Sequence, residues 1–131
     1  MKRFMIVGLA LTITACSDIP RNIDGNQGYF EFDSAEISRD TRKELIAQSR
    51  YMKVNPDHNI TIEGNCDERG STEYNLALGA LRAGNAKHVI IKEGIESERI
   101  KTVSYGKERP QYLGTGEEVW QKNRNVTTRI K

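Results

Sequence analysis

The sequence predicts an α+β fold: a two-layer sandwich in which a four-stranded mixed sheet is covered on one face by helices. Short stretches with strand character alternate with longer stretches of helical periodicity, in the order β-α-β-α-β-(α)-β. Each long helical stretch carries a single stripe of residues suited to burial, and no internal repeat is visible. At 131 residues the chain has room for one compact domain, which excludes a multi-domain enzyme.

The first fifteen residues are predicted to be a signal peptide. Lys2 and Arg3 precede an apolar run, Phe4–Ala15, that is too short to cross a hydrocarbon core of about 30 Å as a helix. The run leads into Ile13-Thr14-Ala15-Cys16, which resembles the bacterial lipobox. The resemblance implies cleavage before Cys16, an S-diacylglycerol on its thiol and an N-acyl chain, and Ser17 implies sorting to the outer membrane. An ordinary leader that contains a cysteine is the alternative.

Residues 16–27 are predicted to be the lipidated cysteine followed by a short tether. The segment has no apolar periodicity and contains several residues that favour turns, among them Pro20 and Gly25. About eleven extended residues reach at most about 40 Å, so the domain at residues 28–131 would stay close to its membrane.

The domain is expected to begin with a strand and a helix. The strand is predicted at Tyr29–Phe32, which is short and aromatic. The helix is predicted to follow Ser38 and to end at Asn55-Pro56, because proline stops a helix. Its buried stripe consists of residues spaced by four and three positions: Leu45, Ser49 and Met52.

A second strand and a long helix are predicted next. Asn59–Glu63 alternates with the period of two that marks a half-buried strand. After the polar loop Gly64–Gly70, a helix is expected from the N-cap Ser71 to the stop at Gly94. Residues of mostly small size recur along it at spacings that would let the helix lie close on a sheet: Gly79, Ala83, Ala86 and Ile90.

The last part of the chain is predicted to contain two strands and a short helical piece. The strands are expected at Ile100–Tyr105 and Asn125–Ile130, with the helical piece around Glu117–Lys122 between them. These strands complete the four of the predicted sheet.

The charge balance argues against a nucleic-acid partner. The chain has 20 Lys and Arg against 18 Asp and Glu, and loss of Lys2 and Arg3 with the leader leaves a net charge of zero. No stretch has the density of basic residues that a polyanion requires. With Cys16 used for lipid, Cys66 has no partner for an internal disulfide, so the fold must depend on its core alone.

One motif spans the second strand, the polar loop and the second helix. It reads Ile60-Thr61-Ile62-Glu63-Gly64-Asn65-Cys66-Asp67-Glu68-Arg69-Gly70-Ser71-Thr72-Glu73-Tyr74-Asn75, with Leu78-Gly79 and Arg82-Ala83 after it. Supporting runs are Tyr29-Phe30-Glu31-Phe32-Asp33, Ser104-Tyr105-Gly106-Lys107-Glu108-Arg109-Pro110 and Lys122-Asn123-Arg124. Over residues 28–131 the chain resembles the OmpA-like peptidoglycan-binding domain family, and a lipobox before such a domain is similar to the family's lipoproteins. The resemblance implies an OmpA-like sandwich that binds the diaminopimelate stem peptide of peptidoglycan.

Asp67 and Arg82 are expected to face one ligand site. Asp67 follows a strand and Arg82 lies about three turns into the next helix, so the chain returns both to one edge of the sheet. A carboxylate accepts from an ammonium and a guanidinium donates to a carboxylate, which suits the zwitterionic end of meso-diaminopimelate. We expect Arg82 to be partly exposed. The resemblance adds four more residues to the site: Phe32, Asp33, Leu78 and Arg124.

Simpler interpretations of the charged residues remain open. Asp67 and Arg82 could form a structural ion pair or a loop cap, and Arg124 could be a surface charge. Glu68 and Arg69 are predicted to form a solvated loop face or a partner surface. Trp120 is predicted to serve packing, and His58 and His88 lack neighbours at metal-binding spacing, so no metal site is expected.

The chain departs from the family pattern at a few positions. Asn65-Cys66 stands where the family usually has His-Ala, and Leu81 and Asn125 each stand where it has Arg. The loss of two cations is expected to weaken the positive field around the pocket. Cys66 is predicted to be a half-buried replacement for Ala, with a reactive thiol or an intermolecular bridge as the alternatives.

The resemblance also implies where and with whom the protein works. It implies a lipid-anchored protein of the outer membrane that faces the periplasm and tethers this membrane to the cell wall, with TolB of the Tol system as a protein partner. An anchor without a Tol partner is one alternative. A cell-wall hydrolase is another, but no acid/base pair, zinc set or nucleophile with its base is legible. We therefore expect no catalysis, and no cofactor beyond the covalent lipid on Cys16.

Overall fold

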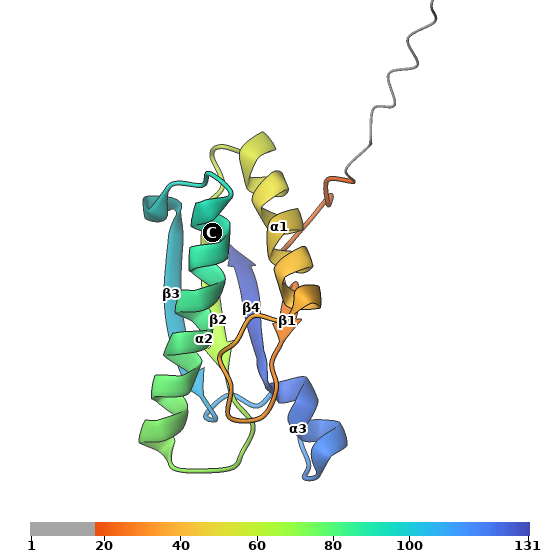
Figure 1. Ribbon diagram of the computed structural model, residues 1–131, viewed down its shortest axis with the longest axis vertical. Helices are drawn as coiled ribbons and strands as arrows, with labels where there is room; N and C mark the ends of the chain where they lie inside the picture. The colour runs from red at the N-terminus through yellow and green to blue at the C-terminus, as the bar shows by residue number, and fades with distance from the viewer. Residues whose placement is uncertain (1–17) are drawn as a thin grey trace, which may run out of the picture.

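The computed structural model describes residues 18–131. The predicted signal peptide and Cys16 lie outside the described residues. Within them the elements follow in the order β1 (Gln27–Tyr29), α1 (Arg39–Val54), β2 (Ile60–Asn65), α2 (Thr72–Lys92), the 3₁₀ turn η1 (Ser97–Arg99), β3 (Ile100–Gly106), α3 (Glu117–Asn123) and β4 (Asn125–Ile130) (Figure 1).

The strands form one mixed sheet in the order β1-β4-β2-β3. β2 and β3 run parallel because α2 carries the chain back between them, and β4 is antiparallel to both β2 and β1. α1 and α2 lie on one face of the sheet, and α3 lies beside the end at which β4 begins (Figure 1). The predicted α+β sandwich with a four-stranded mixed sheet is confirmed.

Both long helices begin where the sequence predicts, and they bury the side chains that it predicts to be buried. The Ser38 and Ser71 side chains accept hydrogen bonds from the backbone N–H groups of Thr41 and Tyr74, as N-caps do. The predicted stripe of α1 is fully buried: Leu45, Ser49 and Met52. These side chains pack with those of α2 and the strands, among them Ile60, Ile62, Ala83, Ala86, Ile90, Ile100 and Val126. The core therefore lies between the helical layer and the sheet.

Two glycines set the distance between α2 and the sheet. A Cβ atom on Gly64 would lie 1.9 Å from the backbone oxygen of Gly79, and one on Gly79 would lie 2.3 Å from the Ser104 hydroxyl. Only residues without a side chain permit this contact, so α2 lies directly on β2 and β3. The prediction that small residues bring this helix close to the sheet is confirmed.

The first strand differs from its prediction. It was expected at Tyr29–Phe32, but β1 ends at Tyr29. The carbonyls of Phe30 and Glu31 accept hydrogen bonds from the guanidinium groups of Arg124 and Arg82. These carbonyls serve as anchor points for arginine, so the aromatic segment continues as a loop although its composition favours a strand.

The tether is also shorter than predicted, because the folded domain begins before residue 28. Ile23 is completely buried in the core. The Gly25 N–H donates to the Thr128 carbonyl, and the Thr128 N–H donates to the Asn26 carbonyl. The tether that was expected to run to Gln27 therefore ends before Ile23.

Substitution of Gly64 tests the close packing of α2. We expect Gly64→Ala to lower the free energy of unfolding by about 3 kcal/mol or more, because its Cβ atom would force the backbones of α2 and β2 apart. Gly84 is the control, since it lies in α2 and a Cβ atom there would meet nothing within 4 Å. Gly84→Ala should stabilise the domain by about 0.5–1 kcal/mol. Urea denaturation of both variants would measure this difference, and equal effects would contradict it.

Candidate functional site

A cavity of about 370 Å³ opens between the loop after β1, the β2–α2 loop and the first half of α2. Most of the predicted site residues line it: Phe32, Asp33, Asp67, Leu78 and Arg82. The lining also includes Cys66, Arg69, Gly70, Tyr74 and Asn75. The fold thus brings together residues that are up to fifty positions apart in the sequence.

Asp67 lines the cavity and is 4% exposed. Its Oδ1 accepts from the backbone N–H of Arg69 at 3.0 Å and from Arg69 Nε at 3.3 Å. Its Oδ2 accepts from Arg69 Nη2 at 2.8 Å and from Arg124 Nη1 at 3.4 Å. Burial acts to raise the pKa of this carboxyl, but the hydrogen bonds and charge of Arg69 hold it below its ordinary value. Asp67 is therefore an ionised carboxylate whose four acceptor sites are all occupied.

Arg82 is buried, with 1% of its surface exposed. Its guanidinium donates to three backbone carbonyls: from Nε to Ser34 at 2.8 Å, from Nη1 to Asn65 at 2.9 Å and from Nη2 to Glu31 at 3.0 Å. Burial lowers the pKa of this guanidinium, although an arginine remains charged in a protein. The expectation of a partly exposed side chain is wrong, because the loop after β1, through Glu31 and Ser34, and the end of β2, at Asn65, enclose the guanidinium.

Arg82 and Asp67 share the cavity but form no ion pair in the described chain. The alternative of a structural ion pair between them is therefore wrong. The three hydrogen bonds of Arg82 use three of its five N–H donors, which leaves one on each terminal nitrogen. Two such donors are what a bidentate contact with a ligand carboxylate requires.

Arg124 lies behind the cavity and fixes Asp67. Its Nη1 contacts Asp67, its Nη2 donates to Glu117 at 2.6 Å, and its Nε donates to the Phe30 carbonyl at 2.9 Å. The hydrogen bond to Glu117 raises the pKa of this guanidinium. At 4% exposure the side chain is not a surface charge, which overturns that alternative. The prediction that Arg124 supports the site agrees with its contact to Asp67.

Arg69 is a site residue that the sequence reasoning assigned to a solvated loop face. Its guanidinium lies between two rings, 3.9 Å from the centre of Phe32 and 4.0 Å from that of Trp120. Glu68 accepts from Trp120 Nε1 at 2.8 Å, which holds the indole in place. The spacing of Asp67 and Arg69, two positions apart in a short loop, could have predicted that they pair. The two aromatic residues that contact Arg69 could not be predicted in this way, because they lie far away along the chain.

The outer rim of the cavity is aromatic and acidic. Phe32 is 56% exposed and Tyr74 is 50% exposed. The Tyr74 hydroxyl donates to the Asp33 carboxylate. Asp33 has φ of +53°, a left-handed conformation that costs energy for a residue other than glycine and turns the loop toward the cavity.

Of the positions that depart from the family pattern, Cys66 lines the cavity, and Asn65, Leu81 and Asn125 do not. Leu81 is 59% exposed. Asn125 is buried, and its side-chain oxygen accepts a hydrogen bond from the side-chain amide of Asn65 at 2.9 Å. The expected weakening of the positive field around the cavity stays a prediction. Cys66 is 4% exposed rather than half-buried, and burial raises the pKa of its thiol, so an unreactive replacement for Ala describes it best.

No helix within residues 18–131 is long and apolar enough to cross a membrane. No group of three His, Cys, Asp or Glu side chains among these residues could hold a metal ion.

Comparison with known proteins identifies the family. A model of the OmpA family matches residues 29–124. The chain is 39% identical over 121 residues to the peptidoglycan-associated lipoprotein of Mesorhizobium japonicum, which covers 92% of this chain and 71% of that protein. It is 32% identical over 145 residues to the protein of the same name in Haemophilus influenzae, with 96% and 95% covered.

Solved structures give the same result. The crystal structure of the peptidoglycan-associated lipoprotein from Burkholderia pseudomallei matches with a TM-score of 0.78 and 37% identity, over 80% of this chain and 89% of that one. The C-terminal domain of Helicobacter pylori MotB matches with a TM-score of 0.75 at 21% identity, over 81% and 84% of the chains, which is a likeness of fold alone.

The chain therefore belongs to the OmpA family. The similarity to the peptidoglycan-associated lipoproteins within that family confirms the resemblance that the motifs predicted. The shared name of these relatives describes an association and a lipid modification and names no reaction, in agreement with a binding protein rather than an enzyme.

Truncation of Arg82 tests its place in the site. We expect Arg82→Ala to lower the free energy of unfolding by at least about 3 kcal/mol, because three backbone carbonyls lose charge-assisted hydrogen bonds of about 1.5–3 kcal/mol each. Leu81→Ala is the matched control, since Leu81 adjoins it in the helix but is 59% exposed, and its effect should stay within about 0.5 kcal/mol. Urea denaturation followed by circular dichroism would measure both, and a wild-type midpoint for Arg82→Ala would contradict the prediction.

Proposed function

We propose that the chain is an outer-membrane lipoprotein that binds the diaminopimelate stem peptide of peptidoglycan without a covalent bond. In this way it tethers the outer membrane to the cell wall as part of a Tol/Pal system. The proposed ligand site consists of Asp67, Arg82, Phe32, Asp33 and Leu78, with Arg124 as the residue that fixes Asp67. The single observation that carries the proposal is that Asp67 and Arg82 border one small cavity with opposite charges.

The distal end of meso-diaminopimelate fits these two charges. Its carboxylate would accept the two N–H groups of Arg82 that no carbonyl of the protein uses. Its ammonium would donate to the Asp67 carboxylate, and its methylene chain would lie against Leu78 and Phe32. Lysine in the same place of the stem peptide has the ammonium but lacks the carboxylate.

The occupied state of Asp67 adds a condition to this mode of binding. All of its acceptor sites face Arg69 or Arg124, so a ligand ammonium must replace a donor. Arg69 is the donor that can leave, because its side chain is 32% exposed whereas that of Arg124 is 4% exposed. Its guanidinium would move out from between Phe32 and Trp120 as the ligand enters.

The partner and the location rest on the relatives. Their name describes lipoproteins, and Cys16 with its lipobox is the residue that would carry the lipid. TolB is proposed as a protein partner because of the same similarity to these relatives. The alternative, a wall-anchoring lipoprotein without a Tol partner, differs from this proposal only in lacking TolB. A hydrolase is not proposed, because the name that the relatives share describes an association with peptidoglycan and names no reaction.

Ligand chemistry provides the sharpest test. A stem peptide with meso-diaminopimelate should bind about tenfold to a hundredfold more tightly than the lysine form, because the lysine form leaves the Arg82 donors without a charged partner, at about 1–3 kcal/mol. Amidation of the distal carboxylate should weaken binding in the same direction. Titration calorimetry on the unaltered domain would measure all three ligands, and this design avoids any variant that unfolds.

Equal affinities for the diaminopimelate and lysine peptides would show that Arg82 does not read the distal carboxylate. Asp67→Asn provides a second test, since it keeps the volume of the side chain and removes the negative charge that would pair with the ligand ammonium. It should lower retention on insoluble peptidoglycan sacculi, while Glu73→Gln, an exposed acid outside the cavity lining, should not.

Replacement of Cys16 tests the anchor. The Cys16→Ser precursor should remain unlipidated, because only a thiol forms the thioether, and the protein should enter the aqueous phase of a detergent phase separation. The unaltered protein should enter the detergent phase, since several acyl chains at about 0.8 kcal/mol per buried CH₂ hold it there. Recovery of the unaltered protein in the aqueous phase would rule out the lipoprotein assignment.

A further inference from the structure

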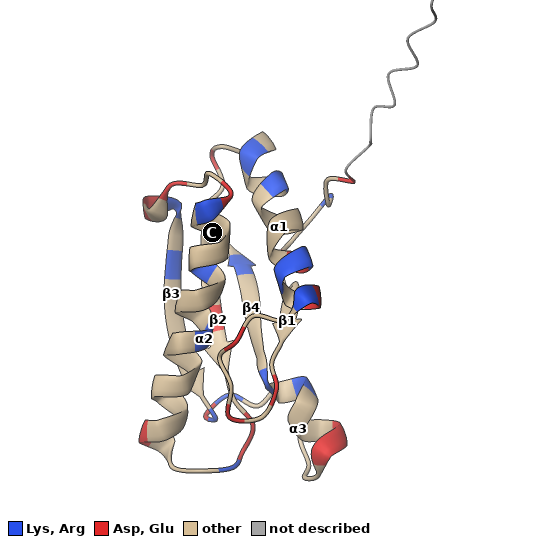
Figure 2. Cartoon of the chain, in the orientation of Figure 1, with Lys and Arg blue, Asp and Glu red and all other residues tan. Residues whose placement is uncertain are grey.

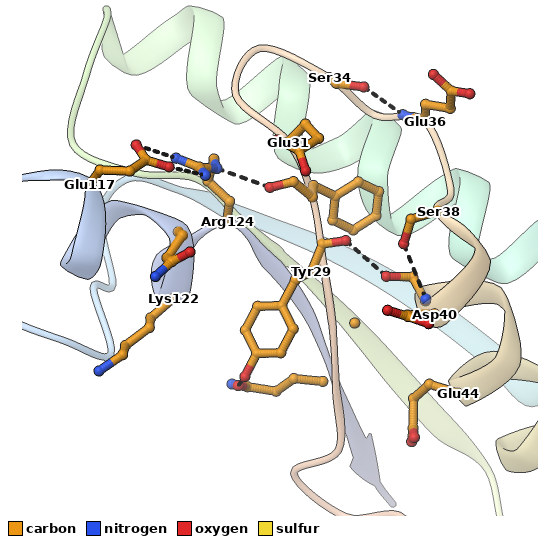
Figure 3. Close-up of a pocket in the computed structure, with 15 residues that line it drawn as sticks. Tyr29, Glu31, Ser34, Glu36, Ser38, Asp40, Glu44, Glu117, Lys122 and Arg124 are labelled. Carbon is orange, nitrogen blue, oxygen red and sulfur yellow. Dashed lines mark hydrogen bonds and ion pairs between the residues drawn. The ribbon is translucent and has the colours of Figure 1, made fainter.

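A second and larger cavity, of about 800 Å³, lies along the outer edge of β1. Figure 3 views it with this edge toward the reader: the loop after β1 lies above, α1 on one side and α3 on the other. We call it the β1 groove. Its lining residues are Gln27, Gly28, Tyr29, Phe30, Glu31, Ser34, Glu36, Ser38, Asp40, Thr41, Glu44, Glu117, Gln121, Lys122 and Arg124. It is separate from the proposed ligand cavity, with which it shares none of these residues.

The backbone of β1 has hydrogen-bonding groups that face this groove. The Thr128 N–H donates to Asn26 and the Phe30 N–H donates to Arg124, so by alternation Gly28 also pairs with β4. Gln27 and Tyr29 therefore point their N–H and C=O groups away from the sheet. Thr41 Oγ1 donates to the Tyr29 carbonyl at 2.8 Å, and the remaining groups have no partner in residues 18–131. This is an open edge at which another strand can pair.

The negative charge of the β1 groove favours a strand with basic side chains. Five of its lining residues are acidic and two are basic. Arg124 already pairs with Glu117 at 2.6 Å, and Lys122 lies 5.3 Å from the centre of the Tyr112 ring. Glu31, Glu36 and Asp40 are exposed and have no cationic partner among the described residues. Figure 2 shows acidic positions on the loop after β1 and at the start of α3.

We propose that the β1 groove docks an extended, basic segment of a partner protein as a fifth strand beside β1. Main-chain hydrogen bonds to Gln27 and Tyr29 would supply affinity, and alternate Lys or Arg side chains would reach the acids of the loop after β1 and of the start of α1. The intervening side chains would be apolar and would contact Tyr29, which is 48% exposed. A second copy of this chain paired through its own β1 would bring like charges together, so the charge favours a different protein.

A hexapeptide of alternating lysine and valine, blocked at both ends, is the probe, and the matching glutamate and valine peptide is its control. The lysine peptide should bind the unaltered domain in titration calorimetry, with an affinity that falls as NaCl is raised from 50 to 300 mM, because added salt shortens the Debye length and screens the attraction between the charges. It should also slow hydrogen exchange at the Gln27 and Tyr29 amides, which face the groove, and leave the Gly28 amide unchanged. A purely ionic association would weaken with salt but would not protect these amides.

Paired variants connect the binding to the groove. Glu31→Gln with Glu36→Gln removes two exposed carboxylates for which no hydrogen bond is found, and it should weaken peptide binding at least about fivefold. The matched control, Glu73→Gln with Glu98→Gln, changes two exposed acids outside the groove and should bind as the unaltered domain does.

Three results would overturn the proposal. They are equal affinity for the lysine and glutamate peptides, an equal effect of the two double variants, and unchanged exchange at the Gln27 and Tyr29 amides. Self-association that protects these amides without peptide, seen by light scattering, would also overturn it by assigning the edge to a second copy. None of these readouts depends on peptidoglycan, so they stand apart from the test of the proposed ligand site.

Discussion

The three hydrogen bonds from the buried Arg82 guanidinium to backbone carbonyls are the interaction on which the site depends. They join the loop after β1, through Glu31 and Ser34, to the end of β2 at Asn65, and all three donors stand on α2. A charged group can be buried in this way only when its donors are satisfied, and carbonyls supply acceptors that a loop can offer without a side chain. The loop is therefore held by the side chains of Arg82 and Arg124 and not by strand pairing.

This loop also divides the molecule into two surfaces. Phe32 and Asp33 face the smaller cavity beside Asp67, whereas Glu31, Ser34 and Glu36 border the β1 groove. Arg124 contributes to both sides, since it lines the groove and contacts Asp67. Around Asp67 two carboxylates, those of Asp67 and Glu117, balance the charge of two guanidinium groups, those of Arg69 and Arg124. A zwitterionic ligand would enter such a cluster without changing its net charge.

Close packing makes this arrangement possible. Because Gly64 and Gly79 let the backbones of β2 and α2 touch, the guanidinium that starts one turn beyond Gly79 can reach the carbonyl of Asn65. A wider gap between helix and sheet would leave Arg82 short of that carbonyl, and the loop after β1 would lose its anchor. Packing of small residues and burial of a large charged one are thus two parts of one constraint.

Much of the fold could be predicted from local patterns. The caps Ser38 and Ser71, the buried stripe of α1 and the small residues of α2 depend on spacing along a single helix, and that spacing can be read directly. The lipobox is likewise local, and the motif from Ile60 to Ala83 indicated the family. The convergence of Asp67, Arg82, Phe32, Asp33 and Leu78 followed from that resemblance and from the strand-to-helix return.

Tertiary structure alone decided what each charge contacts. Sequence spacing placed Asp67 and Arg82 at one edge, but it could not show that Arg69 and Arg124 take the carboxylate while three carbonyls take Arg82. It also gave the aromatic segment after β1 as a strand and Arg69 as a solvated loop residue. The partners in each case lie tens of residues away, and a buried charge must satisfy its hydrogen bonds with whatever groups the folded chain brings within about 3 Å.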